Sequence, residues 1–185
     1  MVAVITKAGP CKGERDMNKE KSRSVTHWTT QETTKMALVT SLYVVVTVAL
    51  AVVSFGAVQI RLSEMFNYLA LYNKRYIWAI TLGVAIANFS SPNGLLDVVV
   101  GSVCTFLVLV VNHQVTKRIQ NMKYKMVITA IVFSLSMFTV AGQLTFLYGL
   151  PFFYNWLIIG LGELLSMTVG GIIIYFIGQK VDLTK

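Results

Sequence analysis

The chain has 185 residues, of which 55% are hydrophobic and only 13% are charged, whereas a typical soluble domain carries about 25% charged residues. The formal net charge is +8, but the basic residues lie in short segments between long apolar runs. Such a distribution sets membrane topology and argues against a nucleic-acid-binding surface. Residues 1–35 hold 11 of the 24 charged side chains. We therefore predict a polar, mobile cytoplasmic tail at 1–34 and one all-α membrane domain at 35–185.

The N-terminal region raises two questions of processing. The first apolar run starts only at Met36 and is long enough to span a membrane, so we expect a retained helix and not a cleaved secretory signal. Met17 is an alternative to Met1 as the true start of the protein. Cys11 and Cys104 lie in a polar tail and an apolar run, and their spacing predicts neither a disulfide nor a metal site.

Six apolar segments follow one another along the chain. A transmembrane helix needs about 20 mostly apolar residues, and the second and third segments are shorter than that. We favour six transmembrane helices, and the alternative is four full spans with one re-entrant hairpin. The segments are Met36–Phe55, Met65–Tyr72, Tyr76–Phe89, Leu95–Val111, Met126–Leu150 and Phe152–Ile177.

The basic residues predict the orientation. If the N-terminus is inside and the chain crosses six times, 15 of the 16 Lys and Arg residues are cytoplasmic and only Arg61 is external. Basic residues concentrate in cytoplasmic loops. The sequence therefore predicts that both termini are cytoplasmic in a multi-pass protein of a bacterial cell membrane.

Polar residues of the membrane domain gather in its predicted outer half. A charged group in hydrocarbon costs about 2.5–3.5 kcal/mol on insertion scales and therefore suggests a function. We expect an outward-facing pocket with a formal charge of about −2, which favours a cationic ligand or one rich in N–H donors. The candidate substrate-binding residues are Gln59, Arg61, Glu64, Asn88, Asn93, Asp97, Gln143, Tyr148, Trp156 and Glu163.

Structural roles compete with binding for several of these residues. Arg61 and Glu64 are three residues apart and could simply pair with each other. Asp97 follows a turn and could cap a helix, and Trp156 could be an interfacial anchor. Glu163 lies about two turns beyond Trp156 in the last segment, without a partner nearby in sequence, so its role is the hardest to explain structurally.

Small residues predict helix-packing faces. Spacing of four residues places small side chains on one helix face and lets two helices approach closely. For the third and sixth segments we expect internal packing, whereas the first segment could present a partner surface. The sets are Ala79, Gly83 and Ala87, then Gly162, Ser166 and Gly170, and finally Ala37 and Ser41.

Sequence motifs of catalysis are missing from the chain. It contains no G-x-x-x-x-G-K-[ST], H-E-x-x-H or G-x-S-x-G motif, so we predict no enzyme, no catalytic residue, no cofactor and no metal site. Uphill transport by such a chain would need an energising partner.

Three stretches carry a family resemblance. SFGAVQIRLSE (54–64), ITLGVAIANFSSP (80–92) and GLLDVVVGS (94–102) resemble the QueT family of substrate-binding S components of energy-coupling factor (ECF) vitamin transporters. The resemblance implies six helices, an extracellular-side pocket and docking on a membrane T component energised by two cytoplasmic ATPases. In S components an A-x-x-x-A pattern on the first helix contacts the T component, and here the matching residues are Ala37 and Ser41.

The family name implies the ligand class. Queuosine precursors are deazaguanine bases, and an aminomethyl deazaguanine is planar, cationic and rich in donors. Glu163 could accept from its guanine-like edge, while Asp97 or Glu64 could meet its ammonium group. Pyridoxine or hydroxymethylpyrimidine in the same role remains open, as do a stand-alone carrier, a scaffold and an intramembrane enzyme using Glu163 with Asp97.

Overall fold

The computed structural model describes residues 29–55, 59–181 and 183, and within these ranges the chain is helical with no β-strand. The chain divides into the units Met1–Thr34 and Lys35–Lys185, of which the second contains the apolar segments. Cys11 and Met17 lie outside the described residues, and so does most of the predicted mobile tail. The tail therefore stays a prediction.

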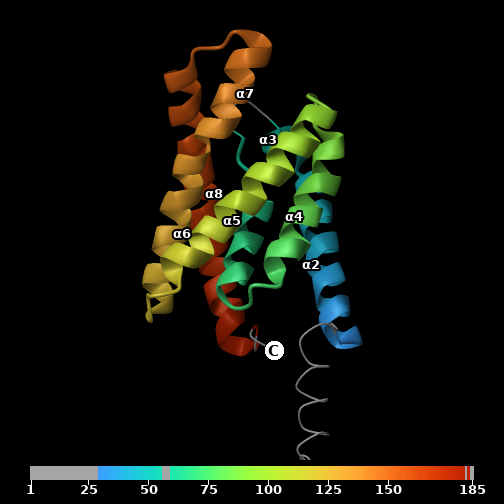
Figure 1. Ribbon diagram of the computed structural model, residues 1–185, viewed down its shortest axis with the longest axis vertical. Helices are drawn as coiled ribbons and strands as arrows, with labels where there is room; N and C mark the ends of the chain where they lie inside the picture. The colour runs from blue at the N-terminus through green and yellow to red at the C-terminus, as the bar shows by residue number, and fades with distance from the viewer. Residues whose placement is uncertain (1–28, 56–58, 182, 184–185) are drawn as a thin grey trace, which may run out of the picture. The chain divides into compact units, whose positions relative to one another are not determined.

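The second unit is a bundle of helices that differ in length and in winding (Figure 1). Most are α-helices, while η1 and η2 are 3-10 helices and η3 is a π-helix continuous with α5. In chain order the elements are α2 (Thr30–Ala49), α3 (Ala51–Ser54), η1 (Leu62–Leu71), α4 (Tyr76–Ala87), η2 (Asn88–Ser90), η3 (Asp97–Gly101), α5 (Ser102–Thr116), α6 (Met122–Ser136), α7 (Phe138–Tyr148) and α8 (Phe152–Lys180).

Four described stretches are long and apolar enough to cross a membrane: Thr30–Ala49, Asp97–Thr116, Met122–Tyr148 and Phe152–Lys180. They correspond to the first, fourth, fifth and sixth predicted segments, so the chain is a multi-pass membrane protein. The third segment, Tyr76–Ser90, is shorter, with a length of about 24 Å. The ten residues of η1 reach about 20 Å, against a hydrocarbon thickness of about 30 Å. Six crossings are therefore not confirmed. Six crossings and four spans with a re-entrant hairpin both remain proposals.

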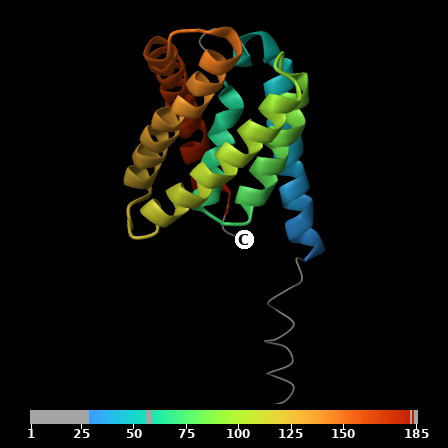
Figure 2. The ribbon, with the colours of Figure 1, turned by 45° about the horizontal axis from the view of Figure 1, so that its top comes forward.

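Basic residues gather at one end of the Lys35–Lys185 unit. The turns between η1 and α4 and between α5 and α6 lie at the same end as the C-terminal end of α8 (Figures 1 and 2). These turns and the adjoining helix ends carry Lys74, Arg75, Lys117, Arg118, Lys123, Lys125 and Lys180. The predicted charge asymmetry thus has a spatial counterpart, while the side of the membrane that this end faces stays a prediction.

The helix η1 forms the centre of the bundle. Phe66, Tyr68 and Leu69 are buried in its middle, and runs of 3-10 helix longer than three or four residues are uncommon. Such a backbone is tolerated at membrane depth because it is buried in protein and not exposed to lipid. The close approach of η1 to α8 depends on Gly170 of α8. A Cβ added there would overlap Met65 Cβ and come within 3.0 Å of Met65 Cα.

The two predicted faces of small residues are confirmed as internal packing faces. On α8, Gly162, Ser166 and Gly170 are all buried. On α4 the small face lies against α2, where the Thr40 hydroxyl donates to the Ala79 carbonyl at 2.8 Å. A Cβ at Gly83 would lie 3.0 Å from Tyr43 Cβ.

The predicted span Met126–Leu150 is broken near its middle. α6 ends at Ser136 and α7 begins at Phe138, with Met137 between them. The Ser136 hydroxyl donates to the Phe133 carbonyl at 2.7 Å, and serine side chains that bond to the preceding turn often bend helices. α7 then ends at Tyr148 and is followed by Gly149, whose φ of +67° is left-handed, as glycine after a helix end commonly is.

Candidate functional site

A small polar cavity lies where η1 begins, against α5, the α6–α7 break and α8. Its volume is about 60 Å³, which is room for a few water molecules. Five predicted site residues line it, and they include one guanidinium and two carboxylates, for a formal charge of −1. The full lining is Gln59, Arg61, Glu64, Val100, Gly101, Cys104, Thr105, Val108, Phe133, Ser136, Met137, Thr139, Val140, Gln143 and Glu163.

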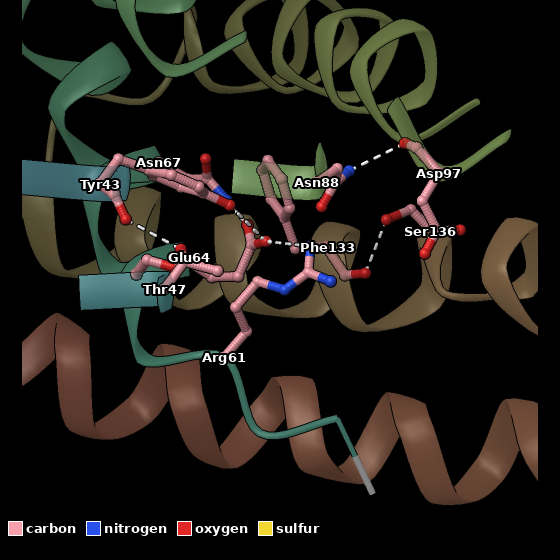
Figure 3. Close-up of polar contacts among 10 residues, drawn as sticks. Tyr43, Thr47, Arg61, Glu64, Asn67, Asn88, Asp97, Phe133 and Ser136 are labelled. Carbon is pink, nitrogen blue, oxygen red and sulfur yellow. Dashed lines mark hydrogen bonds and ion pairs between the residues drawn. The ribbon is translucent and has the colours of Figure 1, made fainter. Parts of the chain in front are cut away.

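Glu64 is held by donors from two helices (Figure 3). The Tyr43 hydroxyl of α2 donates to Glu64 Oε1 at 2.9 Å, and the Asn67 amide donates to Oε2. Arg61 Nη1 lies 3.6 Å from Glu64 Oε1, so the predicted pairing of these two residues is confirmed. Because Tyr43 and Asn67 both serve as donors, Glu64 has a fixed orientation at the cavity wall.

Arg61 and the start of η1 are positioned by further contacts. The Arg61 guanidinium carbon lies 5.2 Å from the centroid of the Phe55 ring, a cation–π distance. Thr47 of α2 donates to the Ser63 hydroxyl at 2.6 Å. These contacts attach the first turn of η1 to α2 and present Arg61 to the cavity.

Glu163 differs from Glu64 because part of its carboxylate has no partner. The residue is only 2% exposed, and its Oε1 accepts no hydrogen bond from the residues that the structure describes. It lines the same cavity as Arg61 and Glu64 and lies within electrostatic reach of both. A buried acceptor without a donor is costly, so Oε1 marks a place where a ligand donor would be stabilised.

Asp97 lies at the start of η3 and is separated from the cavity by Gln143. Its carboxylate accepts hydrogen bonds from the Gln143 amide and the Ser91 hydroxyl, and from the Asn93 amide at 3.2 Å. Its side chain does not cap the helix, so the predicted cap is wrong. Because Gln143 lines the cavity, Asp97 orients a cavity residue without lining the cavity itself.

The other predicted residues near Asp97 belong to the same network. The Asn88 amide donates to the Asp97 carbonyl at 2.8 Å, as Figure 3 shows. The Tyr148 hydroxyl donates to Asn93 Oδ1 at 2.5 Å. Asn88, Asn93 and Tyr148 are therefore joined to the site through Asp97, and none of them lines the cavity.

Trp156 has a different environment. Its indole Nε1 donates to the Leu135 carbonyl at 3.1 Å, and its ring centroid is 6.1 Å from that of Phe152. The aromatic residue that lines the cavity is Phe133. A stacking role for Trp156 would require it to leave these contacts.

Sequence reasoning missed several residues of the site. Asn67 follows Glu64 by three residues, a spacing that places both on one side of a helix, and Tyr43 is an isolated hydroxyl-bearing ring within an apolar run. Ser136 and Thr139 near the α6–α7 break also line the cavity. Their closely spaced hydroxyls within an apolar run were the sequence feature that could have identified them. Within the described ranges, no group of three or more His, Cys, Asp or Glu side chains is arranged to hold a metal ion.

A polar, charged cavity enclosed by long apolar helices defines a multi-pass membrane protein with a candidate site for a small solute. The profile of the QueT transporter family matches residues 33–180. The chain is also 36% identical over 165 residues to the protein named "Queuosine precursor transporter QueT" of Lactococcus lactis subsp. cremoris (strain MG1363), covering 84% of this chain and 97% of that protein. The chain therefore belongs to the QueT transporter family, and it is a transporter, not an enzyme. No solved structure matches it.

Proposed function

We propose that the chain is the substrate-binding S component of an ECF-type importer in the bacterial cell membrane, and that it captures a queuosine precursor of the deazaguanine class. The observation that carries the proposal is the unpartnered Oε1 of buried Glu163 in a cavity that also contains the Arg61–Glu64 pair. The printed name of the Lactococcus lactis relative supports the ligand class.

The chemistry of the cavity fits an aminomethyl deazaguanine. Its guanine-like edge presents N–H donors, of which one would satisfy Glu163 Oε1. Its ammonium group would neutralise the formal charge of −1 on the lining, through Glu64 or through Asp97 after Gln143 moves. Charge-assisted hydrogen bonds of this kind are shorter and about twice as strong as neutral ones.

Ligand capture requires the cavity to enlarge. Its volume of about 60 Å³ is well below the roughly 300–1,000 Å³ of pockets that enclose drug-sized ligands. The break between α6 and α7 at Met137 borders the cavity and interrupts the regular helical backbone. We therefore expect α7 to move outward about Met137 when the ligand enters.

The direct test is a calorimetric titration of the purified protein with the aminomethyl deazaguanine base. The Glu163→Gln variant removes a charged acceptor and should weaken binding about 10- to 100-fold, since a hydrogen bond to a charged group contributes about 1.5–3 kcal/mol. Glu32→Gln is the matched control, because it makes the same carboxylate-to-amide change in the first turn of α2, outside the cavity lining. Equal affinity of Glu163→Gln and the unaltered protein would refute this role of Glu163.

The competing ligands are tested in the same titration. Pyridoxine and hydroxymethylpyrimidine are smaller rings that would need less enlargement of the cavity, but both lack the fused guanine-like edge. Tighter binding of either would replace the deazaguanine as the ligand while leaving the S-component role intact. Binding of none of the three would refute the capture of a planar heterocycle of this kind.

The proposed partners are a membrane T component and two cytoplasmic ATPases. Ala37 and Ser41 are exposed on α2, whereas its other face, with Thr40 and Tyr43, is buried. Two small residues on an exposed helix face allow a second helix to approach closely. This arrangement supports the docking surface that the family resemblance implies.

Co-purification tests the partners independently of the ligand. We expect the double variant Ala37→Leu, Ser41→Leu to lose the T component and its ATPases while it still binds ligand. The matched control is Val169→Leu, which enlarges another exposed apolar residue on α8. Undiminished co-purification of the double variant would show that the partners dock elsewhere, and co-purification of no ATPase by the unaltered protein would favour a stand-alone carrier.

A further inference from the structure

A second hollow, separate from the polar cavity, runs between α6 and α8 on the outside of the bundle. Its volume is about 520 Å³, and it shares no lining residue with the cavity. We call it the α6–α8 groove. It is lined by Tyr68, Lys123, Met126, Val127, Ala130, Ile131, Leu164, Met167, Thr168, Gly171, Ile172, Tyr175 and Phe176.

The groove lies between α6 and α8, which are in close contact near Gly160, while Tyr68 of η1 lines the space between them further along. Near the polar cavity the Ser134 hydroxyl of α6 donates to the Gly160 carbonyl of α8 at 2.7 Å. Toward the basic end Tyr68 of η1 lies between the two helices, and its hydroxyl donates to the Met167 carbonyl at 3.0 Å. Figure 1 shows α6 and α8 separating toward the end of the C-terminus. Tyr68, which is 2% exposed and lines the groove, forms its floor.

The charge of the groove is concentrated at one end. Lys123 is its single charged lining residue, and no acidic residue belongs to the described lining. The Lys123 ammonium lies 5.7 Å from the centroid of the Tyr175 ring, which holds it at the mouth of the groove. Lys117, Arg118 and Lys125 lie in the same turn or at the start of α6, so the apolar channel ends at a basic cluster.

The long, narrow shape of the groove suits a thin occupant better than a packed helix. A helix 10–12 Å across occupies about 400–600 Å³ in each 5.4 Å turn. The groove extends along α8 from Leu164 to Phe176, about 18 Å of helix or more than three helical turns. Over that length the groove offers only about the volume that one turn of a helix occupies. A hydrocarbon chain is thin enough to lie along such a channel.

We propose that the α6–α8 groove binds an anionic phospholipid of the surrounding membrane, with an acyl chain along the apolar channel and the phosphate at Lys123. The channel faces the bilayer, since Val127 and Ile172 at its edges are 56% exposed on helices that cross the membrane. Basic pockets between transmembrane helices are known to bind anionic headgroups. The site does not depend on the proposed solute or on the ECF partners.

The test is native mass spectrometry of the full chain with dioleoyl phosphatidylglycerol and dioleoyl phosphatidylcholine, which share acyl chains and differ in headgroup charge. We expect phosphatidylglycerol to be retained in preference, and Lys123→Gln to lower its affinity about fivefold, because one basic side chain near the surface contributes about 1 kcal/mol. Lys74→Gln is the matched control, since Lys74 is an exposed residue of another basic turn and does not line the groove.

A second variant tests the channel itself. Val127→Trp places a large ring in the groove and should reduce retention of both lipids, whereas Lys123→Gln should affect only the anionic one. Equal retention of both lipids by the unaltered protein, or equal losses in Lys123→Gln and Lys74→Gln, would overturn the proposal. It would also be overturned if Val127→Trp left lipid retention unchanged and instead abolished binding of a membrane protein partner.

Discussion

The contact between Gly170 and η1 offers a quantitative test of how the site is built. The change is Gly170→Ala, in the middle of α8. The added Cβ would overlap Met65 Cβ and lie 3.0 Å from Met65 Cα. Both of these Met65 atoms are fixed to the backbone, so rotation of a flexible side chain cannot relieve the overlap, and η1 or α8 must shift.

We expect Gly170→Ala to lower the free energy of unfolding by about 2 kcal/mol, within the 1–3 kcal/mol typical of overpacking. For a chain of this length such a loss corresponds to a fall in Tm of about 4–8 °C. Met65 follows Glu64 directly, so a displaced η1 also moves a wall of the polar cavity. Ligand affinity should therefore fall together with stability.

The matched control is Gly142→Ala in α7. There the nearest atom to an added Cβ is Phe152 Cε2 at 3.9 Å, an ordinary contact. Replacing glycine by alanine within a helix then stabilises by about 0.5–1 kcal/mol. Thermal unfolding of the three purified proteins in one detergent measures the difference. A Gly170→Ala protein as stable as Gly142→Ala would refute the inference that α8 needs this glycine to approach η1.

Three further changes test the remaining contacts. Tyr43→Phe removes the hydroxyl that donates to Glu64 and should lower both thermal stability and ligand affinity, with a loss of about 1–3 kcal/mol in unfolding free energy; unchanged values in both assays would show that this donor is dispensable. Trp156→Phe should leave ligand affinity within about twofold in the calorimetric titration, because the indole contacts Leu135 and not the cavity, and a large loss would place this ring on the ligand. With Cys11 and Cys104 replaced by serine, Lys74→Cys in inside-out vesicles should react with a membrane-impermeant thiol reagent if the turn between η1 and α4 is cytoplasmic, whereas a re-entrant hairpin would leave it unlabelled.

The long helices could be predicted from the sequence because hydropathy accumulates over about 20 residues and depends little on tertiary context. The boundary between α7 and α8 also has a local signal, because Pro151 interrupts the helical backbone there. The concentration of basic residues at one end of the bundle followed in the same way. These features are properties of single segments, which is why one sequence was sufficient to predict them.

The winding of the short segments could not be predicted. The chain from Leu62 to Leu71 forms a 3-10 helix in a setting where glycines of α8 permit a close approach. The π turn from Asp97 to Gly101 likewise lies among tertiary contacts, including those of Asn88 and Gln143 with Asp97. Local propensity alone favours none of these deviations, because each depends on which helices become neighbours.

The site was predicted in outline but not in its connections. Charge and position placed Arg61, Glu64 and Glu163 in one half of the membrane domain, and all three line the cavity. Asp97 was expected beside them, yet Gln143 separates it from the cavity. The donors to Glu64 were missed, since Tyr43 reaches it only because α2 lies beside η1, a pairing that the sequence does not reveal.

The helix η1 connects features that would otherwise be independent. Glu64 in its first turn forms a wall of the polar cavity, Met65 contacts Gly170, and Tyr68 forms the floor of the α6–α8 groove. The helix then leads into the turn that carries Lys74 at the basic end. Because Gly170 leaves no free space beside Met65, a ligand that displaces Glu64 must also move α8 or shift η1 toward that turn. We therefore expect movement of Glu64 on ligand binding to be transmitted along η1 toward the basic end of the unit.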